Sequence, residues 1–148
     1  MDLSKVSPAD KRILYAAIGV VIGGIVGIID AWGAFAYLGL IGGVAAGYVV
    51  LQPQLAPAMK LPMQKPQLLL ACGVIAAGGF ALAILTYLRF ALDITRIYSI
   101  LFDLGFVAAL ALLWFTWTDY KMTMPAPAAA NPAPAAATTP EPPAPPTA

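Results

Sequence analysis

Four long runs of apolar residues alternate with short polar segments along the chain. The runs cover residues 13–29, 34–51, 68–88 and 100–118, and almost no charged residue interrupts them. An α-helix rises about 1.5 Å per residue, so runs of this length reach across a hydrocarbon core of roughly 30 Å, the first only just. The pattern therefore predicts four transmembrane helices.

The segments between the runs have the composition of connections. Residues 30–33, Asp-Ala-Trp-Gly, indicate a tight turn between the first two helices. Segment 52–67 contains four prolines, which forbid a continuous helix because proline lacks an N–H and clashes with the preceding turn. Segment 89–99 is charged, and it fits a loop, an interfacial helix or continuations of both neighbouring spans.

Composition extends this pattern to a fold class. The chain is 61% hydrophobic and 10% charged, whereas a typical soluble domain is about 25% charged. A soluble protein of 148 residues needs a polar exterior that so few charges cannot supply. We therefore expect an all-α integral membrane four-helix bundle over residues 13–120, built from two helical hairpins.

The basic residues predict an orientation, because cytoplasmic segments retain lysine and arginine. With four spans, residues 1–12, 52–67 and 121–148 share one side of the membrane. The basic residues on that side are Lys5, Lys11, Arg12, Lys60, Lys65 and Lys121. The other side holds only Arg89 and Arg96. Because the abundance of Ala, Gly and Pro favours a bacterial source, we expect a multi-pass protein of a bacterial inner membrane with both termini cytoplasmic.

The C-terminal segment 121–148 is a Pro/Ala-rich tail with Glu141 as its one charge beyond Lys121. It has no means of building a core, so we expect a disordered tail with polyproline II character. Pro-x-x-Pro spacings such as Pro140 to Pro143 fit a cytoplasmic partner with an aromatic groove. Such spacings arise easily in a Pro/Ala segment, so a plain spacer is favoured.

Glycine recurs at every fourth position in the first two runs. The two series are Gly19, Gly23 and Gly27, then Gly39, Gly43 and Gly47. Residues four apart share one face of a helix, so each series makes a strip where another backbone can approach closely. We expect the two strips to pack the first two helices on each other. The alternatives are a homo-oligomer interface and a pore lined by the strips.

The later runs carry weaker patterns of small residues four apart. These pairs are Ala77 with Ala81, Gly79 with Ala83, and Gly105 with Ala109. Alanine is so frequent in this chain that we attach little weight to them.

Charged residues gather toward the predicted outer edge. Asp93 lies four residues after Arg89 and three before Arg96, which is the spacing of ion pairs on a helix. Asp103 lies about one turn inside the fourth run, and Asp30 lies at a similar depth. A carboxylate just inside a bilayer is costly and needs a partner or water. We expect interfacial charges that pair; the alternative is a polar site for an ion, a proton or a lipid headgroup.

Several classes of function are disfavoured. Histidine is missing from the sequence, which removes the commonest general base and metal ligand. No HExxH, GxSxG or P-loop motif occurs, so we expect neither an enzyme nor a bound cofactor. The net charge of +1 gives no basic footprint for nucleic acid. Cys72 lies in an apolar run and fits a small buried hydrophobic residue.

The opening Met1–Lys5, followed by Asp10 and Lys11 just before the first helix, resembles the start of small uncharacterised actinobacterial four-helix membrane proteins with a Pro/Ala-rich C-terminal tail. The resemblance covers the first dozen residues, the topology and the style of the tail. It implies a membrane bundle and supplies no activity.

The sequence thus favours a non-enzymatic membrane protein acting as a scaffold or accessory subunit of a membrane assembly. The alternative is a channel or transporter component with an outer-leaflet charged site. The expected partners are the lipid bilayer, a second copy or another membrane protein, and a cytoplasmic protein at the tail.

Overall fold

The computed structural model describes residues 6–29, 33–58, 61–88 and 96–123 of the chain. The helices of this part are α1 (Pro8–Ile29), α2 (Ala34–Leu55), α3 (Lys65–Thr86) and α5 (Ile97–Thr123). Each of the four is long and apolar enough to cross a membrane. For the described residues, the prediction of an all-helical chain with four helices of transmembrane type is confirmed.

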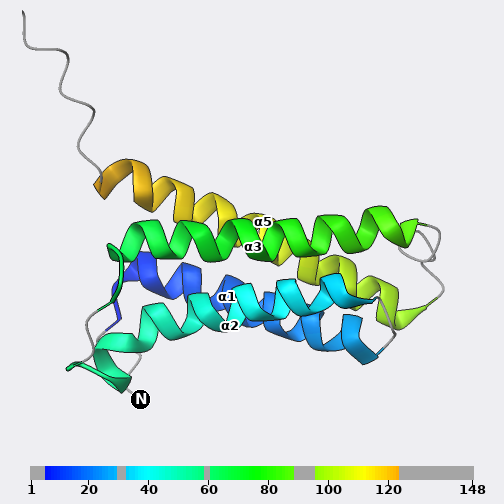
Figure 1. Ribbon diagram of the computed structural model, residues 1–148, viewed down its shortest axis with the longest axis horizontal. Helices are drawn as coiled ribbons and strands as arrows, with labels where there is room; N and C mark the ends of the chain where they lie inside the picture. The colour runs from blue at the N-terminus through cyan, green and yellow to red at the C-terminus, as the bar shows by residue number, and fades with distance from the viewer. Residues whose placement is uncertain (1–5, 30–32, 59–60, 89–95, 124–148) are drawn as a thin grey trace, which may run out of the picture.

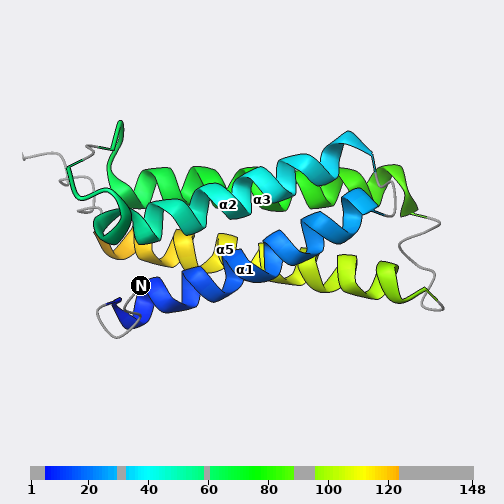
Figure 2. The ribbon, with the colours of Figure 1, turned by 90° about the horizontal axis from the view of Figure 1, so that it is seen from below.

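The helices form a closed ring in which each contacts two neighbours. α1 packs on α2, α2 on α3 and α3 on α5, and α5 closes the ring against α1. Successive helices run in opposite directions, so the start of α1 and the end of α5 lie at the same end of the bundle (Figures 1 and 2). We call this end, which also holds the start of α3, the terminal end, and the opposite one the far end.

At the terminal end, α1 begins before the first apolar run. The Ser7 hydroxyl accepts a hydrogen bond of 3.1 Å from the backbone N–H of Asp10, which is the geometry of a helix N-cap. Pro8 follows as the first helical residue, where its missing N–H has no helical partner to lose. Capping chemistry, rather than hydropathy, therefore sets the start of this helix.

α2 also continues beyond its apolar run, through Pro53 to Leu55. The four prolines do prevent a continuous helix, as predicted, since α2 ends at Leu55 and α3 begins at Lys65; the predicted end at Leu51 is four residues too early. Proline so close to a helix end removes only one hydrogen bond of the last turns, and the end itself is well bonded. The Ala56 N–H donates to the Gln52 carbonyl at 2.8 Å, and the Gln52 side-chain amide donates to the Ala56 carbonyl at 2.9 Å.

The core lies along the axis of the ring and is filled by large apolar side chains. Phe80 of α3 and Phe102 of α5 are fully buried, with ring centroids 4.9 Å apart and planes tilted by 40°. The other large side chains buried to this degree include Ile13, Val20, Leu69 and Leu112. Thr116 is also buried, and its hydroxyl donates to the Leu112 carbonyl of its own helix at 2.9 Å. In the described part of the chain, the interior therefore has no unsatisfied polar side-chain atom.

Candidate functional site

The glycine strip of α1 lies along the contact with α5. Its closest approach is at Gly23, where an added Cβ would overlap the Cα of Gly105. A Cβ at Gly19 would lie 2.8 Å from the Cβ of Ala108, and one at Gly27 would lie 2.6 Å from the ring of Phe102. The first two helices do pack on each other, as predicted, but the α1 strip itself faces mainly α5 and not α2. The ring is closed by α5, which presents a glycine of its own at the level of Gly23, so the two backbones can meet there.

The glycine strip of α2 is divided between two neighbours. A Cβ at Gly39 would lie 2.5 Å from the Phe80 ring of α3, whereas one at Gly43 would lie 2.6 Å from the Val20 side chain of α1. A Cβ at Gly47 would meet nothing within 4 Å. Of this strip, only Gly43 makes the predicted contact with α1, because the inward face of α2 is shared between both of its neighbours in the ring.

Two further glycines make equally close contacts between α2 and α3. A Cβ at Gly42 would lie 2.7 Å from the backbone nitrogen of Ala76, and one at Gly79 would lie 2.7 Å from the backbone nitrogen of Gly39. The small-residue pairs of the later runs therefore include two positions of close helix contact, Gly79 against α2 and Gly105 against α1. The four-residue spacing indicates both positions, but alanine is so frequent that the spacing does not single them out.

The charged residues predicted at the outer edge are only partly visible. Asp30, Arg89 and Asp93 lie outside the residues that the structure describes. Arg96 is exposed directly before α5, and its carbonyl accepts a hydrogen bond of 3.3 Å from the Ile100 N–H. Asp103 is half-buried in α5. Among the described residues the Asp103 carboxylate has no hydrogen-bond or ion-pair partner, so the predicted site is not seen assembled.

The terminal end carries an ion pair that sequence reasoning missed. The Lys65 ammonium, at the start of α3, lies 2.7 Å from the Asp10 carboxylate in the first turn of α1. These helices are diagonal in the ring, so the pair ties two helices that share little other contact. The sequence places Asp10 just before the first apolar run, and no local pattern indicates a partner 55 positions away along the chain.

Aromatic and basic residues of α5 lie at the same end. The rings of Trp117 and Tyr120 stack with centroids 6.2 Å apart, and the Lys121 ammonium lies 5.0 Å from the centroid of the Trp117 ring. Trp, Tyr and Lys side chains of this kind favour the level of lipid headgroups. The last turn of α5 therefore has the chemistry of a membrane boundary.

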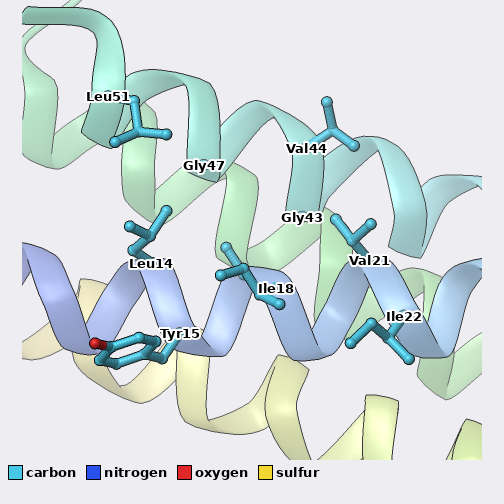
Figure 3. Close-up of a pocket in the computed structure, with 10 residues that line it drawn as sticks. Leu14, Tyr15, Ile18, Val21, Ile22, Gly43, Val44, Gly47 and Leu51 are labelled. Atoms are coloured by element: carbon cyan, nitrogen blue, oxygen red, sulfur yellow. The ribbon is translucent and has the colours of Figure 1, made fainter. Parts of the chain in front are cut away.

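A groove between α1 and α2 opens on the outside of the bundle, and we call it the α1–α2 groove (Figure 3). Its volume is about 430 Å³. It is lined by Leu14, Tyr15, Ala17, Ile18, Val21, Ile22, Gly43, Val44, Gly47 and Leu51. Its walls are branched apolar side chains, and Gly43 and Gly47 leave the α2 side open between them (Figure 3).

A second groove lies between α3 and α5, and we call it the α3–α5 groove. Its volume is about 620 Å³. The lining residues are Leu70, Val74, Leu110, Leu113, Trp114 and Trp117. Trp114 is 68% exposed, so this groove is bordered by a large aromatic side chain that the bundle itself leaves uncovered.

The described residues contain no group of three or more Asp, Glu, Cys or His side chains placed to hold a metal ion, and Cys72 is buried as a free thiol. Comparisons with protein-family models, with curated proteins and with solved structures found no match. The class that the fold defines is a bundle of four transmembrane-type helices. The resemblance to actinobacterial membrane proteins stays a prediction.

Proposed function

We propose that this chain is a non-enzymatic integral membrane protein that serves as a scaffold or accessory subunit of a membrane assembly. The observation that carries the proposal is a contrast between the interior of the bundle and its exterior. The interior is filled by apolar side chains, whereas most of the surface of α5 is exposed on the outside of the bundle. Such a protein acts through what it contacts and not through chemistry in its core.

The outward surface of α5 supports a protein partner in particular. Only 28% of an apolar 18-residue stretch of α5 is buried inside the bundle. The corresponding stretches of α1, α2 and α3 are 44%, 39% and 44% buried. Exposed apolar residues alone would suit lipid equally well. Trp114, however, adds a large aromatic side chain that is 68% exposed and borders the α3–α5 groove. Tryptophan is also enriched among the residues that dominate protein interfaces.

The basic residues support an orientation with both chain ends in the cytoplasm of a bacterium. Lys11, Arg12, Lys65 and Lys121 belong to the terminal end of the bundle, whereas Arg96 belongs to the far end. Basic residues are retained on the cytoplasmic side of inner membranes. A partner of the Pro/Ala-rich tail would then be a cytoplasmic protein.

Photo-cross-linking in membranes tests the proposal. A photoreactive residue replaces Val107 of α5 in one variant and Ile41 of α2 in the control; the two native side chains are 59% and 58% exposed. We expect a discrete cross-linked protein product from position 107 and none from position 41. Adding Trp114→Ala should weaken the product from position 107. Products of equal yield from both positions, or only lipid adducts from both, contradict a partner surface on α5.

The mass of the product separates the two kinds of partner. A product of twice the mass of the chain, seen also with the purified protein in vesicles, identifies a second copy. A product of another mass, absent from the purified protein, identifies a different subunit.

A channel or transporter component is the second candidate, and Asp103 is the observation that favours it. Its carboxylate is half-buried inside the span of α5 and has no partner among the described residues. An intramembrane carboxylate of this kind is expensive and is often part of an ion or proton path. Because Phe80 and Phe102 fill the axis of one bundle, such a path would run between copies or between this chain and a partner.

Flux measurements decide between the two candidates. Purified protein in vesicles is tested for proton and cation leak, with Asp103→Asn beside the unaltered chain. A channel predicts a leak that Asp103→Asn changes. A scaffold predicts no leak above that of empty vesicles in either sample, together with unchanged cross-linking from position 107.

A further inference from the structure

We propose that the α1–α2 groove binds one acyl chain of an anionic phospholipid, whose headgroup phosphate pairs with Lys11 at the terminal end. The proposal rests on the bundle being embedded in a bilayer and is independent of any protein partner on α5. Three observations support it: the shape of the groove, the direction of Tyr15, and the charge at the mouth of the groove.

The groove has the dimensions of an acyl chain. On α1 its lining runs from Leu14 to Ile22, a length of about 12 Å at 1.5 Å per residue. Its volume of about 430 Å³ is well above the room that one water molecule needs, so a run of methylene groups fits in it. Branched side chains such as Ile18 and Val44 form raised walls on both sides (Figure 3). A narrow apolar channel of this kind fits a flexible hydrocarbon chain better than a second helix, which needs a flat strip.

Tyr15 shows which end of the groove belongs to the headgroup. In Figure 3 its hydroxyl is directed toward the N-terminal end of α1, away from Ile18 and Ile22. A tyrosine with an apolar ring and a polar tip aligns the tip with the membrane–water boundary. The groove therefore runs from the boundary at the terminal end toward the middle of the span.

Lys11 supplies charge complementarity at that boundary. It lies three residues before Leu14 and seven before Ile18, so it shares the face of α1 that lines the groove. Within the described residues its ammonium makes no ion pair or hydrogen bond. Asp10, the adjacent carboxylate, is already bound to Lys65 at 2.7 Å. A cation on this face, one turn beyond the groove, is placed for a phosphate whose acyl chain lies between α1 and α2.

Arg12 provides a matched control. It is the next residue and carries the same charge, but it lines a different hollow, between α1 and α5, together with Asp119. The two cations are at the same depth and on different faces. A general attraction between basic residues and an anionic surface would involve both, whereas a site in the α1–α2 groove involves Lys11 alone.

Native mass spectrometry of the full chain in detergent tests the proposal. The protein is titrated with phosphatidylglycerol and with phosphatidylcholine of identical acyl chains. We expect one tightly held lipid per chain and a preference of about fivefold for phosphatidylglycerol, the contribution of one basic residue near an anionic headgroup. Lys11→Gln should remove the preference, and Arg12→Gln should keep it.

A second variant tests the groove itself. Gly47→Leu fills the groove at a position where an added Cβ meets nothing within 4 Å, so the fold should be unchanged by circular dichroism. It should weaken retention of both lipids. Equal affinity for the two lipids, an equal effect of Lys11→Gln and Arg12→Gln, or full retention of lipid by Gly47→Leu would each overturn the proposal. Loss of a dimer in Gly47→Leu, with no lipid bound to the unaltered chain, would assign the groove to a second copy.

Discussion

The contact between Gly23 and Gly105 yields the sharpest test of how this bundle is held together. A single added methyl at Gly23 would overlap the Cα of Gly105, and it would also lie 3.3 Å from the Phe80 ring. The obstacle is backbone, so no side-chain rotation can relieve it. The replacement Gly23→Ala therefore has to push α1 and α5 apart along their whole contact.

Two opposing effects determine how much Gly23→Ala changes the free energy of unfolding. Alanine favours the helix over glycine by about 1 kcal/mol in a helix interior. Overpacking a well-packed contact costs about 1–3 kcal/mol, and the upper part of this range applies where backbone blocks relaxation. The clash should therefore exceed the gain in helix propensity. We expect the free energy of unfolding to fall by about 1–2 kcal/mol.

The control is Gly47→Ala, because nothing lies within 4 Å of a Cβ at Gly47. This variant keeps the gain in propensity without a clash, so its stability should be unchanged or higher by up to about 1 kcal/mol. The assay is unfolding in mixed micelles of increasing dodecyl sulfate fraction, followed by far-ultraviolet circular dichroism. The double variant Gly23→Ala/Gly105→Ala should lose less than the sum of the two single changes, since the first has already separated the helices.

One result would refute this reasoning. If Gly23→Ala and Gly47→Ala unfold at the same dodecyl sulfate fraction, α1 and α5 do not meet at Gly23, and the close approach carries no stability.

Three further predictions use the same unfolding assay. Phe80→Ala should lower stability by about 3–5 kcal/mol because it empties the axis of the bundle, whereas Leu82→Ala, at a side chain 45% exposed, should change it little; equal losses would contradict the core described above. Lys65→Gln and Asp10→Asn should each cost at most about 1 kcal/mol, since the pair is partly exposed, and the double variant should cost no more than either single change; full additivity would exclude a coupled pair. Deletion of residues 124–148 should leave the unfolding curve unchanged, because a Pro/Ala segment has no apolar face to pack; a shifted curve would show that it docks on the bundle.

The bounds of the helices show which helix ends the hydropathy pattern predicts and which it does not. The apolar runs located each of the helices in the described residues, but they placed the start of α1 too late and the end of α2 too early. The cap at Ser7 and the hydrogen bonds of Gln52 set those ends, and neither depends on hydropathy. Helix ends follow from hydrogen-bond partners of a few residues, which a hydropathy pattern does not record.

The candidate sites were predictable in kind but not in arrangement. Glycine spacing correctly marked positions of close approach such as Gly23 and Gly43, yet it named the wrong neighbour for the α1 strip. It also could not rank Gly105 above the many alanines around it. Glycine spacing also predicted a helix contact at Gly47. In the structure no residue packs against Gly47, and the α1–α2 groove lies beside it.

The sequence by itself determined that the described part of the chain contains four helices of membrane-spanning length, because length and apolarity are properties of each segment alone. Only the tertiary structure decided which faces meet. Closing the ring places α5 against α1, and with it Gly105 against Gly23 and a diagonal ion pair between Asp10 and Lys65. These pairs depend on the rotation and level of all the helices at once, since in a membrane small residues and polar groups set the packing once every segment is already apolar.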